Sequence, residues 1–187
     1  MNVYAPYPDH VTVNGKTYRL DLAYDRVMMA LDAQANEALT AADKRDVMLA
    51  LMLKSKPPKD AGQRAAVLAA ITELFPKSEG KAQPRYIDFH QDARLIRSAF
   101  MRMGIDLTRQ KIHFLQFMEL LGDIPEDTAL ARVIDIRRRP LPEPTKSNGK
   151  QIAALMEAKT KVAIRLPEEE QRRTFAESLR SSSVLRG

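Results

Sequence analysis

The sequence predicts a mainly α-helical protein: a helical, bundle-like body with a small N-terminal β-hairpin and a helical C-terminal extension. Apolar residues recur at helical spacing along most of the chain after residue 24. Residues that start or end helices, among them Gly104, Gly122 and Pro125, stand between these segments rather than inside them. Only residues 9–22 show the alternation and the turn pair that are typical of strands.

The predicted hairpin is centred on Asn14-Gly15. Val11 and Val13 precede this pair, and Tyr18 and Leu20 follow it. Asn and Gly tolerate the two positive φ angles of a type I′ turn, whose twist matches that of the adjoining strands. Two short strands are not stable alone, so we expect the hairpin to pack on helices.

The first half of the body is predicted to contain three helices. Thr40 and Asp43 form a capping-box pattern at the start of the second helix, with Asp in the position that Glu usually takes. The pair Pro57-Pro58 ends that helix, and the third begins near Asp60. The apolar positions expected on the inner faces are Val27, Met28, Leu31 and Ala35, then Val47, Met48, Leu51 and Met52, and then Val67, Leu68, Ile71, Leu74 and Phe75.

Three more helices are predicted in the second half. The first ends at Gly104, a left-handed C-terminal cap; Thr108 caps the second, which Gly122 closes; and Pro125 opens the third at its first turn. Their apolar positions are Leu95, Ile96, Ala99, Phe100 and Met103, then Phe114, Phe117, Met118 and Leu121, and then Leu130, Val133 and Ile134.

Charge and composition divide the chain into a body (residues 1–139), a Pro/Ser/Gly linker (140–149) and a basic amphipathic helical extension (150–187). Residues 137–187 contain 12 Lys and Arg against 6 Asp and Glu, whereas residues 1–136 contain 18 of each. The extension shows one amphipathic helix with Ile152, Leu155 and Met156, and the start of another at Pro167. Such a tail either meets an acidic partner or is a solvated segment that keeps the protein soluble.

The composition favours an intracellular protein. The chain has no cysteine, so disulfides and Cys-based zinc sites are excluded. We find no export segment and no apolar run long enough to cross a bilayer, and therefore expect the cytoplasm and no membrane association. The nine methionines suit either an adaptable binding surface or an ordinary core.

No catalytic residue, cofactor or metal site is predicted. The chain has no Gly-rich phosphate loop and no serine in a nucleophile-elbow context. Asp88, His90 and Asp92 would share a face only in a strand, and the helical stripe after them indicates a helix start, where Asp is expected as a cap. We expect His113 to be a partly buried histidine bonded to backbone rather than a general base.

A DNA-binding function is the main alternative. Residues 92–121 read as helix, Gly-containing turn and helix, which loosely fits a helix-turn-helix. Arg137, Arg138 and Arg139 could contact phosphates. Two packed antiparallel helices explain the same pattern without DNA, and the second helix is mainly apolar after Lys111. We therefore expect no nucleic-acid partner.

Several short motifs resemble the bacteriophage gene-product-fifteen family. The resemblance covers residues 9–139, and its most specific part is a block of Phe-x-x-Asp-Ala, Gly-Ile-Asp-Leu and His. The residues that carry it are Val11-Thr12-Val13-Asn14-Gly15-Lys16-Thr17-Tyr18, Asp88-Phe89, Asp92-Ala93, Ile96, Ala99-Phe100, Gly104-Ile105-Asp106-Leu107, His113, Phe117, Leu120-Leu121, Pro125-Glu126-Asp127-Thr128 and Ile134-Asp135-Ile136-Arg137. The family usually has a Trp pair after the histidine, where this chain has Phe114-Leu115.

The resemblance implies a non-enzymatic phage protein that acts in the host cytoplasm. Genes of this family typically lie between those of the major tail protein and the tape-measure protein. That position implies a tail-assembly chaperone that coats the long helical tape measure until the tail tube forms. Another role in the tail or at the head–tail junction is the alternative within the phage.

Partner binding is expected through the helical pair of the second half and the arginines that end the body. Large apolar residues are denser there than one antiparallel pair needs, so some could contact the tape measure or a second copy of the chain. The alternative is that all four apolar residues are simply core. The candidate residues are Phe100, Ile105, Phe114, Phe117, Arg137, Arg138 and Arg139.

Overall fold

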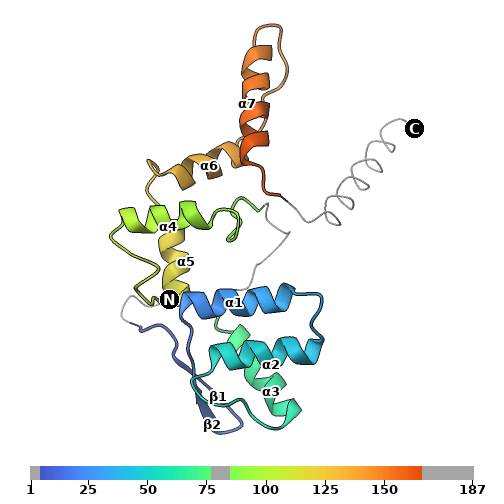
Figure 1. Cartoon of the computed structure of the whole chain (residues 1–187), viewed down its shortest axis with the longest axis vertical. Helices are drawn as coiled ribbons and strands as arrows, with labels where there is room; N and C mark the ends of the chain where they lie inside the picture. The colour runs from blue at the N-terminus through green and yellow to red at the C-terminus, as the bar shows by residue number, and fades with distance from the viewer. Residues whose placement is uncertain (1–4, 77–84, 166–187) are drawn as a thin grey trace, which may run out of the picture. The chain divides into compact units, whose positions relative to one another are not determined.

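The computed structural model describes residues 5–76 and 85–165, and it confirms the mainly helical fold (Figure 1). The predicted helix start at Pro167 lies outside the described residues. The elements are β1 His10–Val13, β2 Lys16–Arg19, α1 Tyr24–Ala35, α2 Ala41–Met52, α3 Ala61–Thr72, α4 Ala93–Arg102, α5 Phe114–Gly122, α6 Ala129–Arg138 and α7 Gly149–Val162.

The chain forms two compact units that alternate along the sequence. The first unit contains residues 1–83 and 100–124, and the second contains residues 84–99 and 125–187. Helix α4 therefore belongs to the second unit up to Ala99 and to the first from Phe100. The predicted boundary between residues 139 and 140 falls inside the second unit, because α7 packs against α6.

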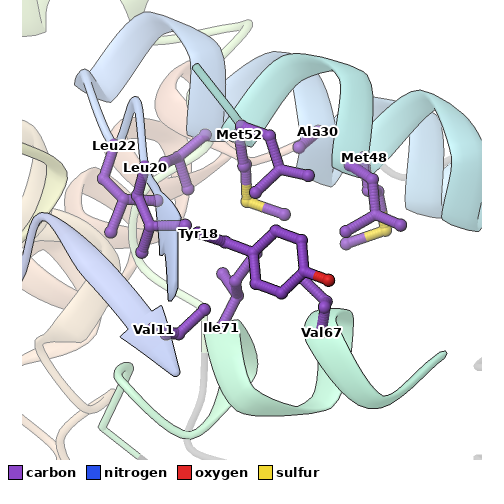
Figure 2. Close-up of a cluster of buried hydrophobic side chains, with 12 residues drawn as sticks. Val11, Tyr18, Leu20, Leu22, Ala30, Met48, Met52, Val67 and Ile71 are labelled. Carbon is purple, nitrogen blue, oxygen red and sulfur yellow. The ribbon is translucent and has the colours of Figure 1, made fainter. Parts of the chain in front are cut away.

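The hairpin forms with the predicted turn. Val11 pairs with Tyr18 across β1 and β2, and φ is +51° at Asn14 and +75° at Gly15, which confirms the type I′ prediction. Val11 and Tyr18 are both buried, so the hairpin packs on the helices through one face (Figure 2). Tyr18 extends between α2 and α3, next to Met48 and Val67 (Figure 2).

The segment after the hairpin joins two other parts of the first unit. The Asp21 N–H donates to the Met52 carbonyl at 2.8 Å, and the Phe114 N–H donates to the Leu22 carbonyl at 2.8 Å. The Tyr24 N–H donates in turn to the carbonyl of Ile112 at 3.0 Å. Residues 20–24 thus lie between the end of α2 and the start of α5, and this places α5 beside α1.

A side-chain cap starts α2 as predicted, and a second side-chain cap starts α3. The Thr40 hydroxyl accepts from the Asp43 N–H, and the Asp43 carboxylate accepts from the Thr40 N–H, a complete capping box. Asp60 caps α3 by accepting from the Gln63 N–H at 2.7 Å. Each cap satisfies an amide that would otherwise lack an intrahelical acceptor.

The buried face of α1 differs from the predicted stripe. Val27 and Ala30 are buried, whereas Leu31 is 45% exposed. Val27 and Ala30 therefore form the buried face of α1, and Met28 is only partly buried. The buried cluster of this unit comprises Val11, Tyr18, Leu20, Leu22, Val27, Ala30, Met48, Leu49, Met52, Leu53, Val67 and Ile71 (Figure 2).

Two helices of the second half begin later than predicted. Gly104 has the expected positive φ of +80°. Thr108 does not cap α5, because its N–H and hydroxyl both bond to the Asp106 carboxylate in a turn. His113 is the N-cap of α5 instead. In the same way, Thr128 rather than Pro125 marks the start of α6, since the Thr128 hydroxyl accepts from the Ala131 N–H.

Helix α7 confirms the predicted helix around Ile152, Leu155 and Met156. It contains no fully buried residue, and Met156 is exposed. None of the helices in the described residues has the length and apolar character needed to span a bilayer.

Removal of the α2 capping box tests the local basis of the fold. We expect Thr40→Ala to lower the free energy of unfolding by about 1 kcal/mol, because the Asp43 N–H loses its acceptor. Thr40→Ser keeps the hydroxyl and should stay close to the parent protein. Chemical denaturation of the three proteins checks this, and equal stability of the Ala and Thr proteins would contradict it.

Candidate partner-binding residues

Five aromatic residues of the first unit form a continuous row of ring contacts, which we call the aromatic stack. The Phe117 ring lies parallel to those of Tyr24 and Phe100, with both centroid separations at 5.0 Å. The ring centroids of Phe114 and Phe117 are 6.4 Å apart, and the Phe114 ring meets the Phe75 ring edge-on at a centroid separation of 5.5 Å. Offset and edge-on rings at these distances attract each other beyond their burial.

The four apolar candidates divide into two interior and two boundary residues. Phe100 and Phe117 are 0% and 2% exposed, so their rings offer no surface to a partner in this structure. Ile105 and Phe114 are half-buried. The Ile105 N–H donates to the Phe100 carbonyl at 2.9 Å, which closes the end of α4. Of these four residues, only Ile105 and Phe114 are exposed enough to contact another chain.

The three arginine candidates have different surroundings. The Arg137 side chain is 7% exposed and binds the Asp92 carboxylate, itself 3% exposed, through two hydrogen bonds of 2.5 and 2.9 Å. Arg139 is exposed and pairs with Asp135, one turn earlier. Arg138 is exposed. The arginine run is thus not one basic patch, because its first member is part of the interior of the second unit.

Arg137 also binds backbone from two other segments. Its guanidinium donates to the Tyr86 carbonyl at 2.9 Å and to the Val162 carbonyl at 2.6 Å, at the end of α7. The Lys159 ammonium donates to the carbonyl of Arg137 at 2.9 Å. Helix α7 is therefore attached to α6 by specific polar bonds and not only by apolar packing.

A neighbouring glutamine fixes the chain just beyond α7. The Gln91 side chain donates to the Ala163 carbonyl at 2.8 Å and accepts from the Arg165 N–H at 2.9 Å. Both bonds are made to backbone, and they join segments that lie more than 70 residues apart. No sequence pattern indicates this contact, because a glutamine in a polar loop has many possible partners.

Asp92 was assigned to a helix start by the sequence, and the structure gives it a larger role. Its carboxylate accepts from the Asp88 N–H at 2.9 Å as well as from Arg137. The available signal was the presence of both Asp92 and Arg137 among the motif residues of the resemblance. Nothing local connects two residues 45 positions apart, so the pair could not be derived from spacing.

The Asp88 carboxylate caps the turn that precedes α4. It accepts from the N–H groups of His90 and Gln91 at 2.9 and 2.7 Å and pairs with Arg85 at 2.9 Å. Burial alone would raise the pKa of Asp88, but these backbone donors and Arg85 hold that pKa below its usual value. Across residues 5–76 and 85–165, no group of three His, Cys, Asp or Glu side chains is placed to hold a metal ion.

His113 connects the N-terminal segment to α5. Its Nδ1 accepts from the Leu115 N–H at 3.1 Å, so Nε2 carries the proton and donates to the Pro8 carbonyl at 3.1 Å. Its ring stacks on Tyr7 at 4.9 Å, and the Tyr7 hydroxyl donates to Glu119. The predicted backbone-bonded histidine is confirmed. Partial burial lowers its pKa, against the Pro8 carbonyl and Glu119, which raise it.

The methionines are divided between core and surface. Met48 and Met52 lie in the core of the first unit, whereas the side chains of Met29, Met101, Met118 and Met156 are 40–55% exposed. The core interpretation is confirmed for Met48 and Met52, and the interpretation as a binding surface stays a prediction for the exposed group. Exposed methionines provide apolar contact area that adapts to the shape of a partner.

The buried ion pair predicts a strong asymmetry between mutations. We expect Asp92→Ala to destabilise the protein by about 3–5 kcal/mol, because it leaves the Arg137 guanidinium buried without its counter-charge. Asp135→Ala breaks the exposed pair with Arg139 and should cost less than about 1 kcal/mol. Denaturant unfolding of both variants measures the difference, and similar losses would contradict the internal position of Arg137.

The histidine cap predicts a pH dependence. Because the folded state lowers the pKa of His113, its contribution to stability is present above pH 6.5 and is lost as the pH falls below that value. We expect the free energy of unfolding to fall between about pH 7 and about pH 5.5, where carboxylates remain mostly ionised. His113→Asn keeps an N-cap acceptor that does not titrate, so its slope should be smaller; an unchanged slope would exclude His113 as the cause.

One family comparison accounts for most of the chain. The family model described as Bacteriophage Gp15 protein matches residues 6–164. This match extends beyond the resemblance over residues 9–139 and includes α7, so residues 140–164 have a counterpart in the family. No curated protein and no solved structure matches the chain. A match over this length shows that the chain belongs to the bacteriophage Gp15 protein family.

Proposed function

We propose that the protein is a non-enzymatic assembly factor of the phage tail, which binds the tape-measure protein in the host cytoplasm before the tail tube forms. The family match carries this proposal, since it makes the chain a phage protein. The gene position typical of the family, between the major tail and tape-measure genes, supports the more specific role.

The surface chemistry is compatible with a helical partner. Exposed methionines on α1, α4, α5 and α7 provide adaptable apolar contacts of the kind used to bind amphipathic helices. A chaperone for a long tape measure must accept many similar but unequal helical segments. Flexible, unbranched side chains suit that requirement better than a rigid pocket.

Among the apolar candidates, Ile105 and Phe114 are the residues through which the first unit would contact the partner. Both are half-buried, and Phe114 lies at the end of the aromatic stack, edge-on to Phe75. Phe100 and Phe117 support them from inside.

DNA binding remains the second candidate, and the structure supports it less than the sequence did. The predicted phosphate contact was the run Arg137–Arg139. Arg137 is occupied by Asp92 and backbone carbonyls, and Arg139 pairs with Asp135. Arg138 alone of the three has no ion pair among the described residues.

The proposal is tested by co-expressing the protein with overlapping fragments of the tape-measure protein of the same phage. We expect at least one fragment to co-purify and to stay soluble only with its partner. Failure of every fragment to bind, in a set that covers the whole tape measure, would overturn the proposed function.

Two phenylalanine variants locate the contact. Phe117→Ala removes an interior ring and should cost about 3–5 kcal/mol of stability. Phe114→Ala should lower the melting temperature less but weaken co-purification with the fragment. If Phe114→Ala loses stability as Phe117→Ala does and its folded fraction binds normally, the contact lies elsewhere.

A further inference from the structure

The exposed face of α4 carries two arginines without an acidic neighbour on the same helix. Helix α4 buries Ile96, Ala99 and Phe100 on one side. Arg94 and Arg97 are exposed on the opposite side, and Met101, one turn after Arg97, is 55% exposed. The helix contains three arginines and no acidic residue. Since these side chains project from one continuous helix, their common face follows from helix geometry alone.

Among residues 5–76 and 85–165, no ion pair offsets the positive charges of this face. Arg94 lies in the first turn of α4, where the helix dipole disfavours a positive charge. Arg94 and Arg97 are like charges at i and i+3, which repel. Asp92 precedes the helix, but its carboxylate is already neutralised by Arg137. Neither Arg94 nor Arg97 has an ion pair within the part of the chain that the structure describes.

We propose that the Arg94–Arg97–Met101 face of α4 is a docking surface for an acidic amphipathic helix, and that this helix belongs to the tape-measure protein. The inference rests on the proposed function and names the contact. Carboxylates of the partner relieve the repulsion between the two guanidinium groups, for which Arg is well suited because its planar fork binds carboxylates in pairs. Met101 provides the apolar contact beside them.

The exposed methionine favours a protein over nucleic acid. A phosphate backbone uses basic and polar side chains and gains little from an apolar one in the same row. A helix with acidic and apolar residues one turn apart matches both kinds of side chain on this face. Duplex DNA is therefore the competing ligand for the experiment to exclude.

The test uses the full-length protein and the tape-measure fragment that binds it. We expect Arg94→Gln/Arg97→Gln to weaken binding about tenfold or more, a loss that should shrink as salt screens the parent complex. Its melting temperature should be unchanged or higher, because the two substitutions remove a repulsion. A structural role for these arginines would instead lower the melting temperature.

The matched control is Arg132→Gln/Lys150→Gln, which removes two exposed charges from α6 and α7 of the same unit. It should bind nearly as tightly as the parent. Equal weakening by both double variants would overturn the α4 site, because net charge would then explain the loss. Normal binding by Arg94→Gln/Arg97→Gln would overturn it as well. In that last case the parent still binds, so the proposed function survives.

Two further measurements complete the test. Arg94→Glu/Arg97→Glu should regain affinity for a fragment in which the acidic residues of the bound helix are changed to lysine, and no recovery would count against direct contact. If the parent binds a 30-base-pair duplex at physiological salt and Arg94→Gln/Arg97→Gln does not, α4 is a nucleic-acid site and the inference is wrong.

Discussion

The buried pair of Asp92 and Arg137 is the interaction on which the second unit depends. Removing both charges from water is costly, and the cost is offset only where every donor and acceptor is satisfied. Here the guanidinium binds the carboxylate twice and two backbone carbonyls besides. The pair thereby brings together the loop before α4, the end of α6 and the end of α7. An apolar replacement could fill the same volume, but it could not specify these backbone positions.

The two units are stabilised by different kinds of interaction. The first has an ordinary apolar core, extended by stacked aromatic rings and by hydrogen bonds along residues 20–24. Within residues 85–99 and 125–165, the second unit has few buried apolar residues, and α7 has none. Its order depends more on polar bonds between distant segments. Because such bonds have strict geometry, they position α6 and α7 while leaving much apolar surface half-exposed.

Short-range features could be predicted from the sequence, and long-range ones could not. The turn at Asn14-Gly15, the capping box at Thr40 and the positive φ of Gly104 each follow from the chemistry of a few adjacent residues. The predicted start of α5 at Thr108 is wrong, because the Asp106 carboxylate binds Thr108 in a turn. A Thr108 cap on the helix and a turn with Asp106 are equally plausible from the local sequence. Which face of α1 is buried depends on the element that packs closest to it, and helical periodicity alone does not identify that element.

The candidate site shows the same limit. Density of large apolar residues identified the aromatic stack around Phe117 but could not separate its interior rings from the half-buried Phe114. The arginine run was recognised as basic, yet only the fold shows that Arg137 is internal. Arg94 and Arg97 lie on the exposed face of α4, and the sequence pattern does not separate exposed arginines that have an ion pair from those that lack one. Neither has an ion pair among the described residues, and the nearby Asp92 carboxylate is bound to Arg137.

The alternation of the two units along the chain has a consequence for dissection of the protein. Residues 84–99 and 100–124 belong to different units, so the polypeptide passes from one to the other at three places. A single cut therefore cannot yield either unit intact. Cleavage after residue 83 deprives the first unit of α5 and of the aromatic rings that it carries. Cleavage after residue 139 removes the Val162 carbonyl from Arg137 and the backbone that Gln91 holds. Isolation of either unit requires circular permutation, or a designed loop in place of the segment that belongs to the other unit.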